Sequence, residues 1–251
     1  MNLSSPKIKP NSSTGGMNDT QSFGWLASLM QTTDSLFPSG GYAHSYGLEE
    51  LVALGTVQSK EDLEGFLIEQ ILPSLEKLEL PYLRFCIDAV DAKDYRQLLR
   101  LNEEISAWKL THEIREAGKS QGAQLLRMTL NLYPCPFSKK FHEMLQKEEE
   151  ECQQITATAV IRSAQGVPLT SAMIGWIYQS ISNFCSASIK LLRLGELACQ
   201  KIIHRCINKE RVQGILDRSL RVNHESAGFF NPVLDLASAR HELAFSRLFI
   251  S

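Results

Sequence analysis

Hydrophobic residues recur at helical spacing along this chain from Phe23 onward, and that periodicity is the feature that most limits its possible folds. Runs that alternate β-branched with polar residues, as strands do, are nearly absent. After Ser59, for example, an acidic residue at the third helical position, Asp62, precedes apolar residues at helical spacing. The pattern predicts an all-α protein, a single bundle of about ten helices.

The expected helices and their connections indicate one domain. Pro73 is expected to kink or end the helix that begins after Ser59, because proline lacks an amide hydrogen and disturbs a helix interior. Further helices are expected over residues 25–33, 45–54, 81–90, 94–106, 108–132, 138–150, 153–164, 168–192, 195–207, 209–221 and 233–247. No independent boundary divides them, so the domain is expected to cover residues 23–251. Residues 1–22, rich in Ser, Asn, Gly and Lys, are expected to form a disordered tail without the apolar core of a signal peptide.

Composition limits the classes of partner. Hydrophobic residues make up 43% of the 251 residues and charged residues 22%, which is enough material for one core. With 26 basic and 28 acidic residues, the chain has no electrostatic footprint for nucleic acid or an anionic membrane, so proteins are the expected partners. The six cysteines are dispersed, which indicates reduced thiols and a cytoplasmic protein. Polar residues interrupt residues 172–192 too often for a transmembrane helix.

Small residues are concentrated in the expected helix 168–192. Small side chains allow neighbouring helix backbones to approach closely, so this helix is expected at the centre of the bundle. A seam between two copies of the chain is the alternative.

Several apparent catalytic or metal-binding motifs are incomplete. Lys119 and Ser120 follow a glycine, but position 113, where a phosphate-binding loop needs glycine, is Glu. His241 and Glu242 lack the second histidine of a zinc-protease motif. Cys199 and Cys206 share a helical face near His204, but two ligands make a poor metal site, and buried cysteines act as small hydrophobic residues. We therefore expect no metal, no cofactor and no enzyme; a metal-dependent helical hydrolase stays open as an alternative.

Ser45 beside His44 is not expected to be a nucleophile, because adjacent side chains seldom face one another. Ser45 is expected instead to cap a helix in which Glu49 lies in the first or second turn, favoured by the helix dipole.

The loop before Ser45 supports two interpretations. Its glycines allow unusual backbone angles and would hold Tyr42 and His44 on a rigid surface turn suited to recognition. Alternatively, Phe37 and Tyr42 plug a turn that merely connects two helices. Spacing alone does not decide between them.

The C-terminal segment is unusually apolar for a chain end. Leu243, Phe245, Leu248 and Phe249 alternate with charged residues, and an exposed patch of this kind must dock somewhere. It is expected to dock on its own domain or to be completed by a partner, with Arg240 and Arg247 suited to pairing with carboxylates.

Both ends of the chain also resemble the signature segments of the UreF family of urease accessory proteins. The first segment matches at Phe37, Pro38, Gly40, Tyr42, His44, Ser45, Gly47, Leu48 and Glu49. The last matches at Arg240, His241, Glu242, Ser246, Arg247, Leu248 and Phe249, followed by a terminal serine. One loop departs from the family pattern, since Arg193-Leu-Gly-Glu196 stands where Pro-Leu-Gly-Gln is usual.

The resemblance implies a function. Proteins of this family are helical homodimers that assemble with UreH (also called UreD) and the GTPase UreG on apo-urease, and they regulate GTP-dependent nickel delivery without being catalysts. By position, Phe37, Pro38, Gly40, Tyr42, His44, Ser45 and Glu49 would belong to the surface that governs UreG. The tail residues Arg240, His241, Glu242, Ser246, Arg247, Leu248 and Phe249 would bind UreH, and Tyr178 would lie in the dimer interface. A generic helical adaptor unrelated to urease is the alternative.

Overall fold

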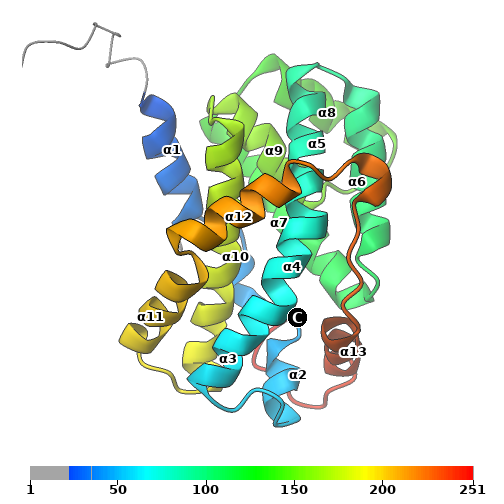
Figure 1. The fold of residues 1–251 in the computed structure, drawn as a ribbon. Helices are drawn as coiled ribbons and strands as arrows, with labels where there is room; N and C mark the ends of the chain where they lie inside the picture. Colours follow the sequence, from blue (N-terminus) through cyan, green and yellow to red (C-terminus); the bar gives the residue numbers. More distant parts are fainter. Residues whose placement is uncertain (1–22, 35, 251) are drawn as a thin grey trace, which may run out of the picture.

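The computed structural model describes residues 23–34 and 36–250, without the side chain of Tyr42. The tail predicted for residues 1–22 lies outside the described residues. Within the described residues there is no strand, and the all-α prediction is confirmed (Figure 1). The α-helices are α1 (Gly24–Thr33), α2 (Leu48–Ala53), α3 (Lys60–Phe66), α4 (Leu72–Ser74), α5 (Leu80–Asp91), α6 (Tyr95–Trp108), α7 (His112–Leu132), α8 (Pro136–Lys147), α9 (Gln154–Ala164), α10 (Leu169–Leu191), α11 (Glu196–Cys206), α12 (Lys209–Ser219) and α13 (Pro232–His241).

Helices α3 to α5 form one continuous rod that passes through two prolines. The rod begins with the predicted capping box, in which Ser59 Oγ accepts from the Asp62 amide at 3.1 Å. Of the two outcomes expected at Pro73, a kink or an end, the helix does not end there, because it continues to Asp91. A π-helical stretch precedes each proline, Leu67–Ile71 before Pro73 and Leu75–Glu79 before Pro81. Wider turns of this kind change the hydrogen-bond register where proline cannot donate an amide hydrogen.

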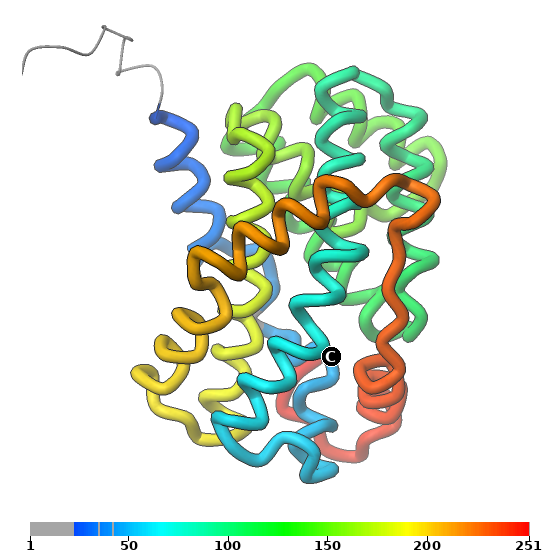
Figure 2. The backbone as a smooth tube through the Cα atoms, in the orientation of Figure 1, coloured from blue at the N-terminus to red at the C-terminus, as the bar shows by residue number. Residues whose placement is uncertain are grey.

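Helix α10 lies at the centre of the bundle, as its small residues predicted. Its inner face is buried from Ala172 to Ser188, and α1, α5, α11 and α12 pack around it (Figures 1 and 2). Helices α7 and α9 also pack closely together. A β-carbon added to Gly122 of α7 would lie 1.9 Å from the Cys152 carbonyl oxygen, so the absence of a side chain permits this approach.

The C-terminal helix differs from its prediction. Helix α13 begins where expected, with Asn231 accepting from the Leu234 amide at 3.2 Å and Pro232 in the first turn. It ends at His241 rather than at residue 247. The chain then reverses and returns to α2, where the C-terminus is marked in Figure 1. The reason is tertiary, because the last residues bond to side chains and carbonyls near α2.

All six cysteines are free thiols, and Cys135 is the one that is not buried. Among the described helices, none combines the length and apolarity that crossing a bilayer requires.

Candidate functional site

The two signature segments meet in space at a point where three helix ends converge. Glu49 lies in the first turn of α2, Glu113 in the first turn of α7, and His241 in the last turn of α13. The partial charge of a helix is positive at its N-terminus and negative at its C-terminus. The two carboxylates therefore have the sign that their own helix ends favour, and a protonated His241 has the sign favoured at a C-terminus.

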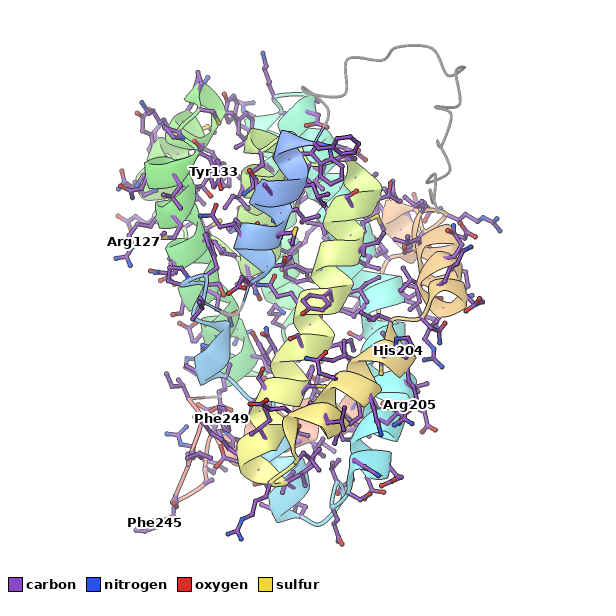
Figure 3. All side chains as sticks on the ribbon, turned by 90° about the vertical axis from the view of Figure 1, so that its left-hand side faces the viewer. Arg127, Tyr133, His204, Arg205, Phe245 and Phe249 are labelled. Carbon is purple, nitrogen blue, oxygen red and sulfur yellow. The ribbon has the colours of Figure 1, made fainter. Side chains whose placement is uncertain are left out.

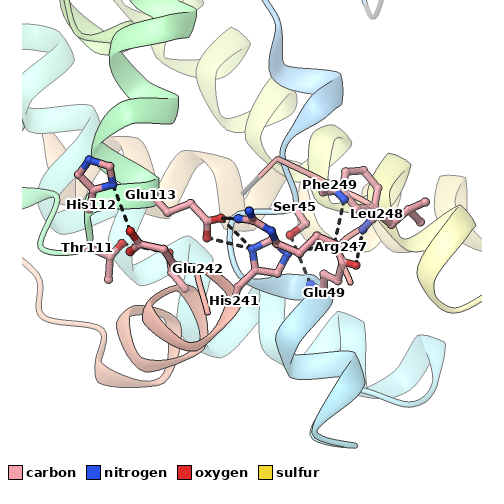
Figure 4. A network of polar contacts seen from close by, with 11 residues as sticks. Ser45, Glu49, Thr111, His112, Glu113, His241, Glu242, Arg247, Leu248 and Phe249 are labelled. Carbon is pink, nitrogen blue, oxygen red and sulfur yellow. Dashed lines mark hydrogen bonds and ion pairs between the residues drawn. The ribbon is translucent and has the colours of Figure 1, made fainter. Parts of the chain in front are cut away.

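His241 is the centre of this cluster (Figure 4). Its Nε2 lies 3.1 Å from Glu49 Oε2, and its Nδ1 lies 2.9 Å from Glu113 Oε1. The ring is 1% exposed. Because both nitrogens face carboxylate oxygens, all of these hydrogen bonds form only when the imidazole carries two protons. Arg247 adds a cation to the cluster, with Nη1 3.2 Å from Glu113 Oε1.

Glu49 also holds the end of the C-terminal segment, residues 242–250, which is called the tail from here on. Its Oε1 accepts from the Leu248 amide at 2.7 Å, and its Oε2 accepts from the Phe249 amide at 2.9 Å. The next amide, of Ile250, donates to the Ala43 carbonyl at 2.9 Å, inside the first signature segment. The Phe249 ring is buried, and Lys190 Nζ of α10 lies 5.6 Å from its centroid. The tail therefore docks on its own domain, one of the two outcomes expected.

The first signature segment is mostly an internal structure. Phe37, His44 and Ser45 are buried, and burial lowers the pKa of His44 below its usual value. The expectation of a surface position for His44 is therefore wrong. Pro38 and Gly40 are exposed, while the side chain of Tyr42 lies outside the described residues.

The start of α2 also differs from its prediction. The N-cap is Gly47 rather than Ser45, although Ser45 Oγ does accept from the Glu49 amide at 3.4 Å. Gly47 has a φ of 84°, and an added β-carbon would lie 3.3 Å from the Ser238 amide nitrogen of α13. Both the left-handed backbone and the close contact favour glycine here. Glu49 lies in the first turn, as predicted.

In this docked conformation, which we call seated, the tail leaves apolar side chains facing outward. Phe245 projects into solvent while Phe249 lies against the molecule near α10 (Figure 3). Leu243 is 86% exposed and Phe245 is fully exposed, and Leu248 and Ile250 are also exposed. Charged groups surround them, including Arg240, which binds Glu50 at 2.8 Å, and Glu242, which lies 3.4 Å from His112.

A large groove of about 1020 Å³ runs beside the first signature segment. Its walls are the loop from Phe37 to Gly41, the end of α1, part of α7, and α10. The lining side chains of α10 include Tyr178, Gln179, Ser182 and Asn183. Tyr178 is 39% exposed, so it lies on the outer face of the central helix and at the rim of this groove.

Sequence reasoning missed Glu113 and the contact between Thr111 Oγ1 and Ser238 Oγ, 3.0 Å apart, which ties α7 to α13. An acidic residue in the first turn of a helix was the only local signal for Glu113. In the described part of the chain, no three or more His, Cys, Asp or Glu side chains are grouped so that they could hold a metal ion. Cys199 and Cys206 are buried, and burial raises the pKa of Cys206 to about 11.

Comparison with known proteins identifies the same family that the two signature segments resemble. A model of the UreF family matches residues 57–207, more than half of the chain, although this range contains neither segment. The chain is 29% identical over 227 residues to the urease accessory protein UreF of Marinomonas sp. (strain MWYL1), a match that covers 90% of this chain and 94% of the relative. It is 28% identical over 242 residues to the protein of the same name from Granulibacter bethesdensis, covering 96% and 98%. The chain therefore belongs to the UreF family of urease accessory proteins.

Proposed function

We propose that this chain is a non-catalytic factor in urease maturation. In the cytoplasm it assembles with UreH (UreD) and the GTPase UreG on apo-urease, and it regulates the GTP-dependent delivery of nickel, the cargo of the process. Membership of the UreF family supports this proposal. So does the incomplete state of each catalytic motif in the sequence.

The observation that carries the proposal is the contact between the two signature segments. Glu49 of the first segment binds the amides of Leu248 and Phe249 of the last. Ile250 bonds directly to Ala43 in the loop. A protein that binds the tail therefore also affects the loop of the first signature segment. In this way UreH, bound at the tail, can influence the surface that meets UreG.

In this proposal the tail residues have two different roles. The UreH-binding surface consists of outward-facing groups, namely Leu243, Phe245 and Leu248 with Arg240, Glu242, Ser246 and Arg247 around them. His241 and Phe249 are buried and support that surface from below.

The loop residues divide in the same way. Pro38, Gly40 and Tyr42 form the part that meets UreG. Phe37, His44, Ser45 and Glu49 hold the loop in place from within. The burial of the first three and the hydrogen bonds of Glu49 support this role.

The proposed homodimer uses the outer face of α10. Ile174 and Tyr178, one turn apart, are 43% and 39% exposed although the opposite face of the helix is buried. Partly exposed apolar side chains on a central helix suit a second copy of the same surface, since a two-fold interface places one patch against itself.

The test is to replace Phe245 by serine. Because this ring makes no buried contact, the variant should keep its thermal melting temperature but fail to co-purify with UreH, and urease activity in nickel-fed cells should fall. Leu197→Ser, at an exposed apolar residue of α11, is the matched control and should bind normally. Normal UreH binding by a folded Phe245→Ser variant would contradict the assignment of the tail.

A further inference from the structure

Glu113 lies outside both signature segments yet contacts two residues of the C-terminal segment. We propose that Glu113 is the positioning residue that keeps residues 242–250 seated on the domain, and that the seated tail is the form a partner recognises. The second half of this inference rests on the proposed function, and the first half does not.

One carboxylate secures the segment at two separate points. Glu113 is 7% exposed, and its two oxygens lie 2.9 and 3.0 Å from His241 Nδ1, where the tail leaves α13. The same carboxylate accepts from Arg247 at 3.2 Å, six residues further on. Buried carboxylates need such partners, because an unpaired buried charge is costly. Glu113 therefore favours the conformation in which the His241 ring and the Arg247 guanidinium are both in place.

The position of Glu113 is itself fixed by the fold rather than by the tail. It lies in the first turn of α7, where the Arg115 amide donates to the Thr111 carbonyl at 3.1 Å. The Thr111 hydroxyl contacts Ser238 of α13 at 3.0 Å. Helix α7 also packs closely along α9. The carboxylate is thus presented by a rigid element and can organise the more weakly packed tail.

The seated conformation already presents the apolar side chains outward. Leu243, Phe245, Leu248 and Ile250 are exposed, whereas Phe249 alone of the apolar tail residues points inward. A partner that binds this surface does not have to order the segment first, and such preorganisation strengthens binding. If the tail were instead an autoinhibitory cover, weakening its seat would strengthen partner binding. The two models predict opposite effects of the same substitution.

The first experiment measures seating in the isolated full-length chain. Glu113→Gln removes the charge with little change of shape, and the control is Glu116→Gln, one turn along α7, where the carboxylate pairs with Lys119 at the surface at 2.9 Å. Hydrogen exchange at the Leu248 and Phe249 amides, which bond to Glu49 and not to Glu113, should be about tenfold faster in Glu113→Gln, as expected for the loss of one charge-assisted hydrogen bond. Exchange along α9 should stay unchanged. Unaltered exchange at both tail amides, or equal loss throughout the chain, would overturn the positioning role.

The second experiment measures binding of purified UreH. Glu113→Gln should bind about tenfold more weakly than the wild-type chain, and Glu116→Gln should bind equally. Equal or tighter binding by Glu113→Gln would overturn the claim that the seated tail is the recognised form. Failure of the wild-type chain to bind UreH would count against the proposed function and against the seated tail as a recognised surface, while the exchange result would still decide the positioning role.

Discussion

Two consecutive carboxylates of α2 show how strongly the surroundings decide what a residue does. Glu50 pairs with Arg240; the Glu50 side chain is 12% exposed, but the Arg240 side chain is 62% exposed. Glu49 accepts two backbone amides of the tail and faces a histidine that is 1% exposed. Exposed ion pairs contribute little to stability, whereas buried donors left without an acceptor are costly. Glu49 is therefore part of the structure, whatever contacts it makes with a partner.

Glu49→Ala should accordingly lower the free energy of unfolding by about 1–3 kcal/mol, because the tail amides and His241 lose their acceptor. Arg240→Ala removes a guanidinium that is 62% exposed, so it should change the free energy of unfolding by less than about 1 kcal/mol. Urea denaturation followed by circular dichroism measures both. Equal stability of the two variants would show that the Glu49 contacts do not hold the tail.

His44 gives a pH-dependent prediction. Burial lowers its pKa in the folded protein below the usual value of 6.5, so the unfolded chain binds a proton more readily. The contribution of His44 to stability is then complete above pH 6.5 and declines as the pH falls through the unfolded-state value. Thermal melts from pH 7.5 to 5 should show a steeper loss for the wild-type chain than for His44→Gln. Parallel curves would mean that His44 does not titrate differently on folding.

At the scale of helices, close packing depends on where the small residues lie. Gly122 faces the start of α9, with the Cys152 carbonyl where a β-carbon would be, whereas nothing lies within 4 Å of an added β-carbon at Gly65 of α3. A methyl side chain at Gly122 would therefore clash with backbone atoms, whereas at Gly65 it would meet open space. Helix α7 carries Glu113, so its contact with α9 also sets the position of the site.

Gly122→Ala should therefore destabilise the protein by about 3 kcal/mol or more, because backbone atoms cannot move aside as a side chain can. Gly65→Ala should stabilise it by about 0.5–1 kcal/mol through the higher helix propensity of alanine. Differential scanning calorimetry of the two variants decides the matter. A higher melting temperature for Gly122→Ala would show that the two helices are not so closely packed.

Across the whole molecule, the core encloses nearly all of the thiol groups. Five of the six cysteines are buried, and Cys135, at the N-terminus of α8, is intermediate in exposure. Burial raises the pKa of Cys185 to about 12 and that of Cys206 to about 11, so few thiolates form near neutral pH. Thiolates are the reactive species, so the fold protects these side chains in two ways.

Titration of the native protein with a thiol reagent should thus give one fast equivalent per chain, and denaturant should release the other five. Cys135→Ser should remove the fast phase, and denaturant should still release the other five thiols. Two or more fast equivalents in the native state would indicate that the packing around α10 and α11 opens readily.

The local features of this protein could be predicted from its sequence because they depend on neighbouring residues. Periodic apolar positions predicted the helices, the Ser59 capping box marked the start of α3, and small residues predicted the central place of α10. The position of the tail depends on residues far apart in the sequence. Glu49 and Phe249 are 200 positions apart, and only the packing of α2, α7 and α13 brings their bonding groups together. The early end of α13 and the contacts of Glu113 with His241 and Arg247 depend on that packing, because a carboxylate holds a distant group only when the tertiary structure places it there. The burial of His44 is likewise a tertiary feature.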